Sequence, residues 1–301
     1  MNNPNPGGRS LGPIRCVTAT APDLEQVEFC YTQFLGHRVA GRGRLGAKLA
    51  ELWGCAGLSG SRYVLLSPAA GDECIFRFIE TQVDADFLPF YTHGWNAAEI
   101  MVKNVDAMAE RLADSPFKII GAPANLSFTD DIRAMQILGP GHELLYLTEF
   151  KRQIPDFNTP IARCDVDLVF IVILGGPSME GLQNFYAEQY GVPRATVVES
   201  RVKGMSAAFG NSPEHKYPIA ALPLAGKSLI EVDEMPPQAR ARAARDGRLP
   251  AGIAMISFAG SNLDEDTATN VGLAEPPYTG AALVTCRQGA AGELIEILHS
   301  A

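Results

Sequence analysis

The stretch GELIEIL at residues 292–298 places one carboxylate, Glu296, inside an otherwise apolar run that is typical of a buried β-strand. An unpaired buried charge is costly, so an inward-facing Glu296 needs a partner, a metal or a substrate. If Glu296 faces water instead, it is an ordinary polar position on the strand. The recurrence of the pattern elsewhere in the sequence helps to decide between these interpretations.

Similar strands close four segments of the chain. They are IFRFIE (75–80), LLYLTE (144–149), LIEVDE (229–234) and LIEILH (294–299). Two of them follow a tight glycine turn, GPGH at 139–142 and AAGE at 290–293. A repeat of this length predicts several copies of one supersecondary unit.

Four other runs open these units as strands. They are IRCVTATA (from residue 14), WNAAEIMV (from 95), VDLVFIVIL (from 166) and GIAMISFA (from 252). The first three lead into helices whose predicted N-caps are Asp23, Asn104 and Ser178. In the fourth unit, NLDEDTATNVG at 262–272 predicts a shortened or irregular helix.

Further strand-like runs lie between helix and closing strand. They are RYVLLSP (from residue 62), RAMQILGP (from 133), TVVESRV (from 196) and SAAFG (from 206). The chain therefore reads as four copies of strand–helix–strand–strand–strand. The polar segment KRQIPDFNTPIAR at 151–163, with two prolines, is the best predicted boundary between domains.

We therefore predict four segments along the chain. Residues 1–12 form a disordered lead-in, 13–150 an N-terminal domain of two units, 151–163 a linker and 164–301 a C-terminal domain of two units.

The units resemble a known superfamily. The matching residues are Asp23-Leu24, Cys30-Tyr31, Gly36, Phe185-Tyr186 and Gly191, together with the closing strands. In these the sequence resembles the vicinal oxygen chelate superfamily, which includes glyoxalase I, extradiol dioxygenases and bleomycin resistance proteins. The resemblance implies an α+β fold with four βαβββ modules forming two tandem glyoxalase-like cups. It leaves open whether the first module pairs with the second or the fourth.

In this superfamily the metal ligands come from the opening and closing strands. Aligning the closing strands gives Arg77, Tyr146, Glu231 and Glu296 equivalent positions. Because alternate residues share a face, Glu296 points with Leu294 and Leu298. Ile295 and Ile297 then point to the helix layer.

The recurrent glutamates predict a site in the C-terminal cup. The resemblance implies that Glu231 and Glu296 are catalytic and hold a divalent metal, with Asp167 as a third ligand. An all-oxygen site favours Mg, Mn or Ca over Zn or Fe, and a site without metal is the alternative. The opening strands carry Cys16, Ala97 and Met255 where histidine is usual. Extradiol ring cleavage is therefore disfavoured.

Other side chains are candidates for substrate binding. Arg77 and Tyr146, if they face one another, suit an anionic group of the substrate. Tyr278 lies in a rigid turn and His215 in a loop, where a solvated role is the alternative for the histidine. Glu99, two residues beyond Ala97, is a possible substitute for a lost ligand. The helical pattern from Leu45 to Trp53 predicts a lid over the N-terminal cup.

Composition limits the partners. The net charge of -9 argues against nucleic acid, which needs a basic face. No apolar stretch reaches the length that spans a membrane. Six scattered cysteines predict free thiols in the cytoplasm. We expect a small-molecule partner and leave a homodimer open.

Three functions fit the sequence. The favoured one is an isomerase, lyase or hydrolase that uses a carboxylate-bound metal to act on a small oxygenated organic molecule. The second is a metal-free small-molecule binding protein of the bleomycin-resistance type. The third is a cofactor-independent enzyme with carboxylate bases.

Overall fold

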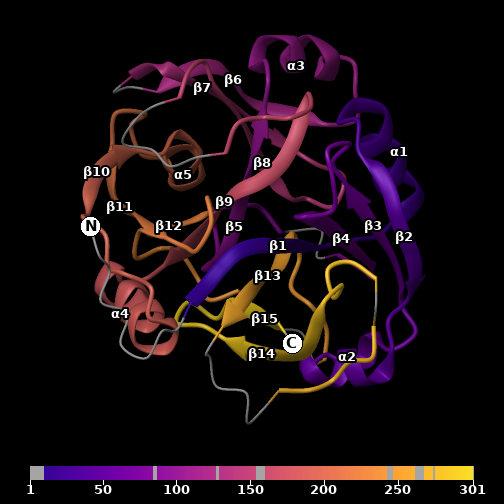
Figure 1. Ribbon diagram of the computed structural model, residues 1–301. Helices are drawn as coiled ribbons and strands as arrows, with labels where there is room; N and C mark the ends of the chain where they lie inside the picture. Colours follow the sequence, from indigo (N-terminus) through magenta and orange to yellow (C-terminus); the bar gives the residue numbers. More distant parts are fainter. Residues whose placement is uncertain are drawn as a thin grey trace.

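The computed structural model describes residues 10–83, 87–126, 129–153, 160–242, 247–261, 268–273 and 275–300. Its elements form a mixed α+β fold of two curled sheets with helices packed on them (Figure 1). The predicted fold class of four repeated modules in two tandem cups is therefore confirmed. No described helix has the length and apolar character needed to cross a membrane.

Each sheet is made of strands from two modules. The seven-stranded sheet has the order β14 (Ala281–Gln288), β15 (Leu294–Ser300), β13 (Ile253–Ser261), β1 (Ser10–Ala21), β4 (Ile75–Glu80), β3 (Arg62–Ser67) and β2 (Arg38–Arg44). The eight-stranded sheet has the order β10 (Val198–Arg201), β11 (Lys216–Pro223), β12 (Leu229–Glu234), β9 (Val166–Gly176), β5 (Gly94–Val102), β8 (Leu144–Phe150), β7 (Thr129–Leu138) and β6 (Lys118–Leu126).

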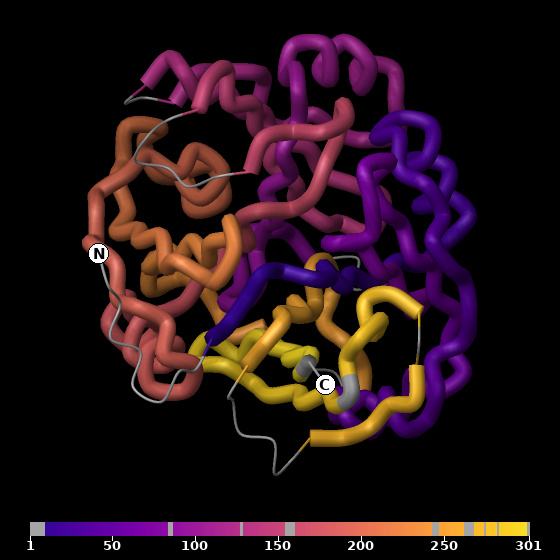
Figure 2. The backbone as a smooth tube through the Cα atoms, in the orientation of Figure 1, coloured from indigo at the N-terminus to yellow at the C-terminus, as the bar shows by residue number. Residues whose placement is uncertain are grey.

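The opening strands meet at the centre of each sheet. Strand β1 pairs antiparallel with β13, and β5 pairs antiparallel with β9. Each opening strand also pairs in parallel with the closing strand of its own module. The first module therefore pairs with the fourth and the second with the third, and strand β1 lies beside strand β13 (Figure 2).

The pairing crosses the predicted linker. Each sheet takes one module from residues 13–150 and one from 164–301, so the linker does not separate the two sheets. Strand β1 begins at Ser10, inside the predicted lead-in, and residues 1–9 lie outside the described residues. Residues 154–159 of the linker and 262–267 of the predicted irregular helix also lie outside them.

The module helices begin where the sequence predicts. Asp23 caps α1 (Leu24–Phe34), Asn104 caps α3 (Val105–Leu112) and Ser178 caps α4 (Met179–Tyr190). In each case the side-chain oxygen accepts a hydrogen bond from a backbone N–H three residues later. These bonds satisfy donors that the first helical turn leaves free.

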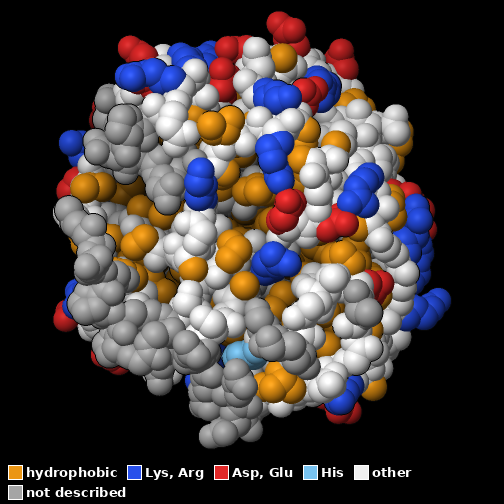
Figure 3. Space-filling model, viewed as in Figure 1, with side chains coloured by type: hydrophobic (Ala, Val, Ile, Leu, Met, Phe, Trp, Pro, Cys, Tyr) orange, Lys and Arg blue, Asp and Glu red, His pale blue; other side chains and the backbone are white. Residues whose placement is uncertain are grey.

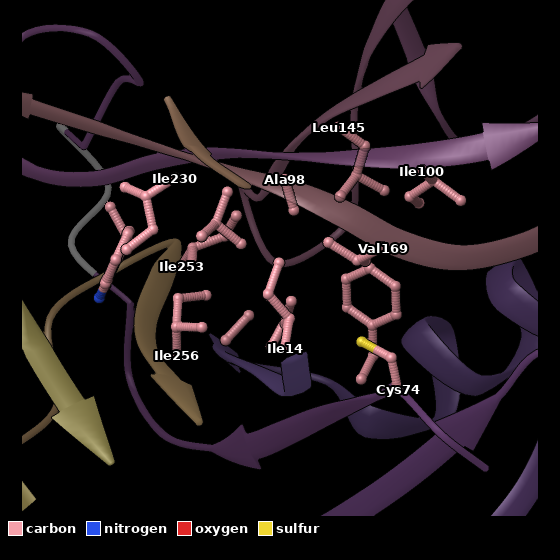
Figure 4. Packing of buried hydrophobic residues seen from close by; sticks show 14 of the residues in the cluster. Ile14, Cys74, Ala98, Ile100, Leu145, Val169, Ile230, Ile253 and Ile256 are labelled. Atoms are coloured by element: carbon pink, nitrogen blue, oxygen red, sulfur yellow. The ribbon is translucent and has the colours of Figure 1, made fainter. Parts of the chain in front are cut away.

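One continuous core lies between these helices and the two sheets. Figure 4 shows part of it, with Ile14 and Ile256 of the seven-stranded sheet near Ala98, Val169 and Ile230 of the eight-stranded sheet. Ile295 and Ile297 belong to this core, as predicted. We call the opposite face of each sheet, turned away from α1, α3 and α4, its cup.

Two buried Tyr–Glu hydrogen bonds repeat across this core. The Tyr31 hydroxyl on α1 donates to Glu143 at 2.9 Å, and the Tyr186 hydroxyl on α4 donates to Glu293 at 2.9 Å. Each glutamate stands directly before the closing strand of a module in the other sheet. The bonds therefore tie the helix of one sheet to the closing turn of the other.

One predicted strand is a helix. The SAAFG run lies in α5 (Lys203–Phe209), which ends at Gly210 in the left-handed conformation. A five-residue apolar run has too little periodicity to distinguish strand from helix, and the glycine here ends a helix. The predicted lid helix is confirmed as α2 (Ala47–Leu52), which is followed by the short η1 (Ala56–Leu58).

Candidate functional site

Glu296 faces the seven-stranded cup and is completely buried. Its partner is Arg77 of the first module, whose guanidinium Nη2 lies 3.1 Å from Glu296 Oε2. Arg77 is only 2% exposed. The carboxylate that interrupts GELIEIL therefore belongs to a buried ion pair, which the pairing of the first and fourth modules creates.

Further donors complete the shell of this ion pair. Trp53 Nε1 donates to Glu296 Oε1 at 2.8 Å, and the Tyr278 hydroxyl donates to the same oxygen at 2.9 Å. Ser257 donates to the other oxygen, Oε2. Both oxygens of the buried carboxyl group therefore have protein donors in place of water.

Arg77 is held by contacts of its own. Its guanidinium donates to Thr18 Oγ1 at 2.8 and 3.0 Å and to the Tyr278 hydroxyl. It also lies over the Trp53 ring, 4.5 Å from the centroid, which is a cation–π distance. The charge of Glu296 and the Tyr278 hydroxyl hold the pKa of Arg77 above its usual value despite burial.

The rest of the seven-stranded cup is filled by apolar side chains. Leu49 and Ala50 of α2, with Trp53, pack against Met255 and Leu298 of the sheet. The predicted lid is therefore part of the packed interior. This cup is closed around a neutralised pair of charges.

The eight-stranded cup carries a different set at the equivalent positions. Tyr146 on β8 and Glu231 on β12 share this cup, and both are partly exposed. Glu99 on β5 lies directly opposite Tyr146 in the register. Asp233 shares the face of Glu231, because Ile230 and Val232 between and beside them point into the core.

Burial raises the pKa of each of these acidic groups, and the charge of Glu231 adds to it for Glu99 and Asp233. Burial, reinforced by the charge of Glu231, raises the pKa of Glu99 to about 8. Burial raises the pKa of Glu231 to about 7, and burial with the charge of Glu231 raises the pKa of Asp233 well above its usual value. The pKa of Tyr146 is raised by burial and then by all three carboxylates. No described cation is among the causes of the three carboxyl shifts.

Apolar and aromatic side chains line the same cup. Buried members are Phe90, Ala97, Leu144, Ile173, Met205, Tyr217 and Met235. Tyr146, Ile171 and Phe209 are partly buried beside them. The space-filling view shows hydrophobic side chains in recesses in the region of α5 and strands β8 and β12 (Figure 3). The carboxylates therefore lie in apolar surroundings.

The remaining predicted residues take separate positions. His215 is exposed in the loop before β11, with its ring 4.7 Å from that of Tyr217, at the edge of the eight-stranded cup. Tyr278 lies buried in the other cup with Arg77. The expectation that Arg77 and Tyr146 face one another is wrong, because they lie in different sheets.

The three predicted metal ligands do not come together. Glu231 and Glu296 lie in different sheets, because the third and fourth modules do not pair. Asp167, at the start of β9, accepts hydrogen bonds from Arg163 at 2.7 to 3.0 Å. Burial alone raises the pKa of Asp167, but the hydrogen bonds and charge of Arg163 outweigh this and hold it below its usual value.

No other group of three metal-binding side chains replaces this set within the described ranges. The position equivalent to Ala97 in the third module is Ile171, because Ile171 pairs with Leu229 as Ala97 pairs with Leu144. Asp167 lies upstream of it. The described residues therefore do not fit the divalent metal that the resemblance implies.

Sequence reasoning underestimated several partners. Trp53 was expected only at the end of a lid, yet it binds Glu296 from 243 positions away. Asp233 shares a face with Glu231 in the sequence pattern, but nothing in the sequence indicates that Glu99 joins them. The i, i+2 spacing along each strand indicates which side chains share a face. Which modules pair decides which faces meet, and the sequence does not indicate that.

A separate surface pocket of about 510 Å³ lies outside both cups, between α1, β2 and β3. Its charged side chains are paired, Arg42 with Glu28 and Arg62 with Glu25. None of the predicted site residues lines it. We therefore place the candidate site in the eight-stranded cup.

Comparison with solved structures identifies the architecture. Glyoxalase I from Zea mays superposes with a TM-score of 0.61 over 97% of this chain and 93% of that chain, at 14% identity. A putative dioxygenase from Bacillus subtilis gives 0.62 over 97% and 86%, at 13% identity. The chain has the tandem glyoxalase fold.

Both neighbours are at most 14% identical, so the likeness shows the fold, which is the fold that the sequence resemblance implies. No protein-family model matches the sequence, and neither does any curated protein. The likeness is therefore one of fold, and the chemistry has to be argued from the two cups.

Proposed function

We propose that the protein binds a small organic molecule in the eight-stranded cup, with Glu99 and Glu231 as its polar contacts. The observation that supports this most is the partial exposure of both carboxyl groups in an apolar cup, where neither takes part in an ion pair among the described residues. In the seven-stranded cup the equivalent carboxylate is buried against Arg77.

The physical argument is the cost of burying carboxylates. A carboxyl group in apolar surroundings pays a desolvation penalty unless a partner compensates for it. A ligand with hydrogen-bond donors compensates in the way that Arg77, Trp53 and Tyr278 do for Glu296. Apolar pockets with a few polar groups are also the usual form of small-molecule sites.

A second function has an observation of its own. The pKa values of about 7 for Glu231 and about 8 for Glu99, both raised chiefly by burial, suit general acid–base catalysis near neutral pH. In this version one carboxylate removes a proton from the bound molecule and the other, protonated, returns one. The reaction is then of the isomerase or lyase type, with no metal needed.

The names of the fold neighbours agree with an enzymatic or binding function only in a general way. Glyoxalase I is an enzyme name, and the Bacillus subtilis protein is called a putative dioxygenase. One fold hosts many chemistries, so neither activity is carried over to this chain.

The test is binding of a neutral fluorescent dye, Nile red, followed by titration of its emission. We expect saturable binding that Ile171→Trp abolishes, because Ile171 lies on the cup wall beside Glu99 in the register. Thr32→Trp, in the surface pocket beside α1, is the matched control and should leave binding unchanged. Binding that survives Ile171→Trp would overturn the proposal.

A further inference from the structure

We infer that the ligand of the eight-stranded cup is an organic cation, a molecule with an ammonium or similar group attached to an apolar body. This inference rests on the proposed function, since it names the class of molecule that the same cup takes.

The first step concerns the ionisable side chains in the cup. Three carboxyl groups, those of Glu99, Glu231 and Asp233, lie on one face of the sheet and affect each other's ionisation. Among the described residues, none of the three takes part in an ion pair. Burial keeps these groups partly protonated near neutral pH. A cationic ligand favours their charged forms, which a neutral or anionic ligand does not.

The second step is an unsatisfied atom. Asp233 is only 1% exposed, and its Oδ1 has no hydrogen-bond partner. Buried polar atoms in folded proteins nearly always have a partner. Because Asp233 is on the cup side of β12, the missing donor has to come from within the cup.

The third step is the shape of the ligand. Phe90 and Tyr217 are buried in the cup, and Tyr146 and Phe209 are partly buried there. Aromatic faces attract cations by cation–π contact as well as packing on apolar groups. Met205 and Met235 add flexible, polarisable surface. An aromatic or aliphatic amine meets both kinds of surface.

The equivalent positions of the other cup supply an internal precedent. There Glu296 is satisfied by a guanidinium that also lies over an aromatic ring, Trp53. The eight-stranded cup has Tyr146 where the other has Arg77. The proposed ligand therefore brings the positive charge that Arg77 provides in the seven-stranded cup.

The experiment compares three probes of similar size and shape by isothermal titration calorimetry at pH 8: benzylammonium, benzyl alcohol and benzoate. We expect the ammonium probe to bind at least about tenfold more tightly than the alcohol, since ionised partners strengthen the contact. Benzoate should not bind measurably. Equal binding of the ammonium and the alcohol would overturn the inference.

Charge-removing variants locate the preference. Glu231→Gln and Asp233→Asn should each reduce the preference for the ammonium several-fold, while Nile red still binds. Glu199→Gln, on the exposed strand β10, removes the same charge outside the cup and should leave the preference intact. A preference that persists in both cup variants would place the cation elsewhere and overturn the inference.

A test with metal ions distinguishes a metal site from a site for an organic cation. If Mg²⁺ or Mn²⁺ alone raises the melting temperature of the wild type but not of Glu231→Gln, the carboxylates hold a metal and the inference is overturned. The two proposals fail separately. Nile red that binds outside the cup overturns the proposed function. Nile red that binds inside it without any ammonium preference overturns only the ligand class.

Discussion

The two cups surround their carboxyl groups with opposite kinds of neighbours. Both have carboxylates on the inner face of a curled sheet, at positions that the repeat makes equivalent. In the seven-stranded cup, Arg77, Trp53 and Tyr278 enclose Glu296 and exclude water. In the eight-stranded cup, Glu231 faces Tyr146 and other acids. One residue type is therefore enclosed by protein groups in one cup and partly exposed in the other.

The difference teaches that a repeated carboxylate has no fixed role in this fold. Its role depends on what the partner module brings to the same position. An arginine there gives a buried ion pair, whereas with a tyrosine there Glu231 has no ion-pair partner among the residues that the structure describes. Variants of the residues in both cups test this contrast.

The largest effect is expected for Arg77→Met. Removing one member of a buried pair leaves Glu296 charged and unpaired, which costs about 3–5 kcal/mol of unfolding free energy. Urea unfolding followed by fluorescence measures it. The double variant Arg77→Met with Glu296→Leu should recover most of the loss. A cost below about 1 kcal/mol for Arg77→Met would show that the pair is not what holds this cup closed.

The two Tyr–Glu bonds should respond equally, because they are equivalent in both halves of the molecule. Tyr31→Phe and Tyr186→Phe each leave one oxygen of a buried carboxyl group, Oε1, without its donor, at a cost of about 1–3 kcal/mol. The same unfolding assay measures both. Phe34→Leu, at a partly buried position at the end of α1, is a control with a smaller expected loss. Very different costs for the two tyrosines would mean that the sheets are not tied symmetrically.

Glu231→Gln should stabilise the protein at pH 8 by about 1–2 kcal/mol and leave it nearly unchanged at pH 5. In the unfolded chain glutamate ionises near pH 4.3, whereas burial raises the pKa of folded Glu231 to about 7. Between these values the folded state binds more protons than the unfolded state. Wild-type stability therefore falls as pH rises from about 5 to 8.

Unfolding free energies at pH 5, 6, 7 and 8 check this slope. Glu199→Gln should keep the full wild-type slope, because its side chain is exposed. Part of the slope should persist even in Glu231→Gln, since burial also raises the pKa of Glu143 and Glu293 to about 7. A slope of opposite sign would contradict the burial of these groups.

The smallest effect is expected for His215→Ala. The ring is exposed and touches only the edge of the cup at Tyr217, so stability should change by less than about 0.5 kcal/mol. Thermal melting measures this change. Nile red affinity should change less than twofold. A large loss of affinity would extend the site to the loop before β11.

Local patterns in the sequence predict most of the fold. The helix caps at Asp23, Asn104 and Ser178 and the glycine turns before the closing strands are short-range signals, and the structure has them where the pattern places them. The alignment of Arg77, Tyr146, Glu231 and Glu296 also rests on strand alternation within each module. All of this is set by neighbours along the chain.

The site depended on contacts that no local pattern contains. Arg77 and Glu296 are 219 positions apart, and their meeting depends on which opening strands pair at the centre of the sheet. Glu231 was assigned to the same cup as Glu296 because they share one half of the sequence. The helix at 203–209 was missed because its apolar run is too short for a period to show.

In the sequence, all strands of the eight-stranded sheet lie between the first and last strands of the seven-stranded sheet. This order decides which sheet is complete first during synthesis. All strands of the eight-stranded sheet lie between Gly94 and Glu234, so it has its parts before the chain ends. The seven-stranded sheet begins at Ser10 but receives β13, the partner of β1, only from residue 253 onward. Until then one edge of β1 stays open, and open strand edges pair with other chains. A chain interrupted before residue 253 would therefore be most prone to self-association through its first strand.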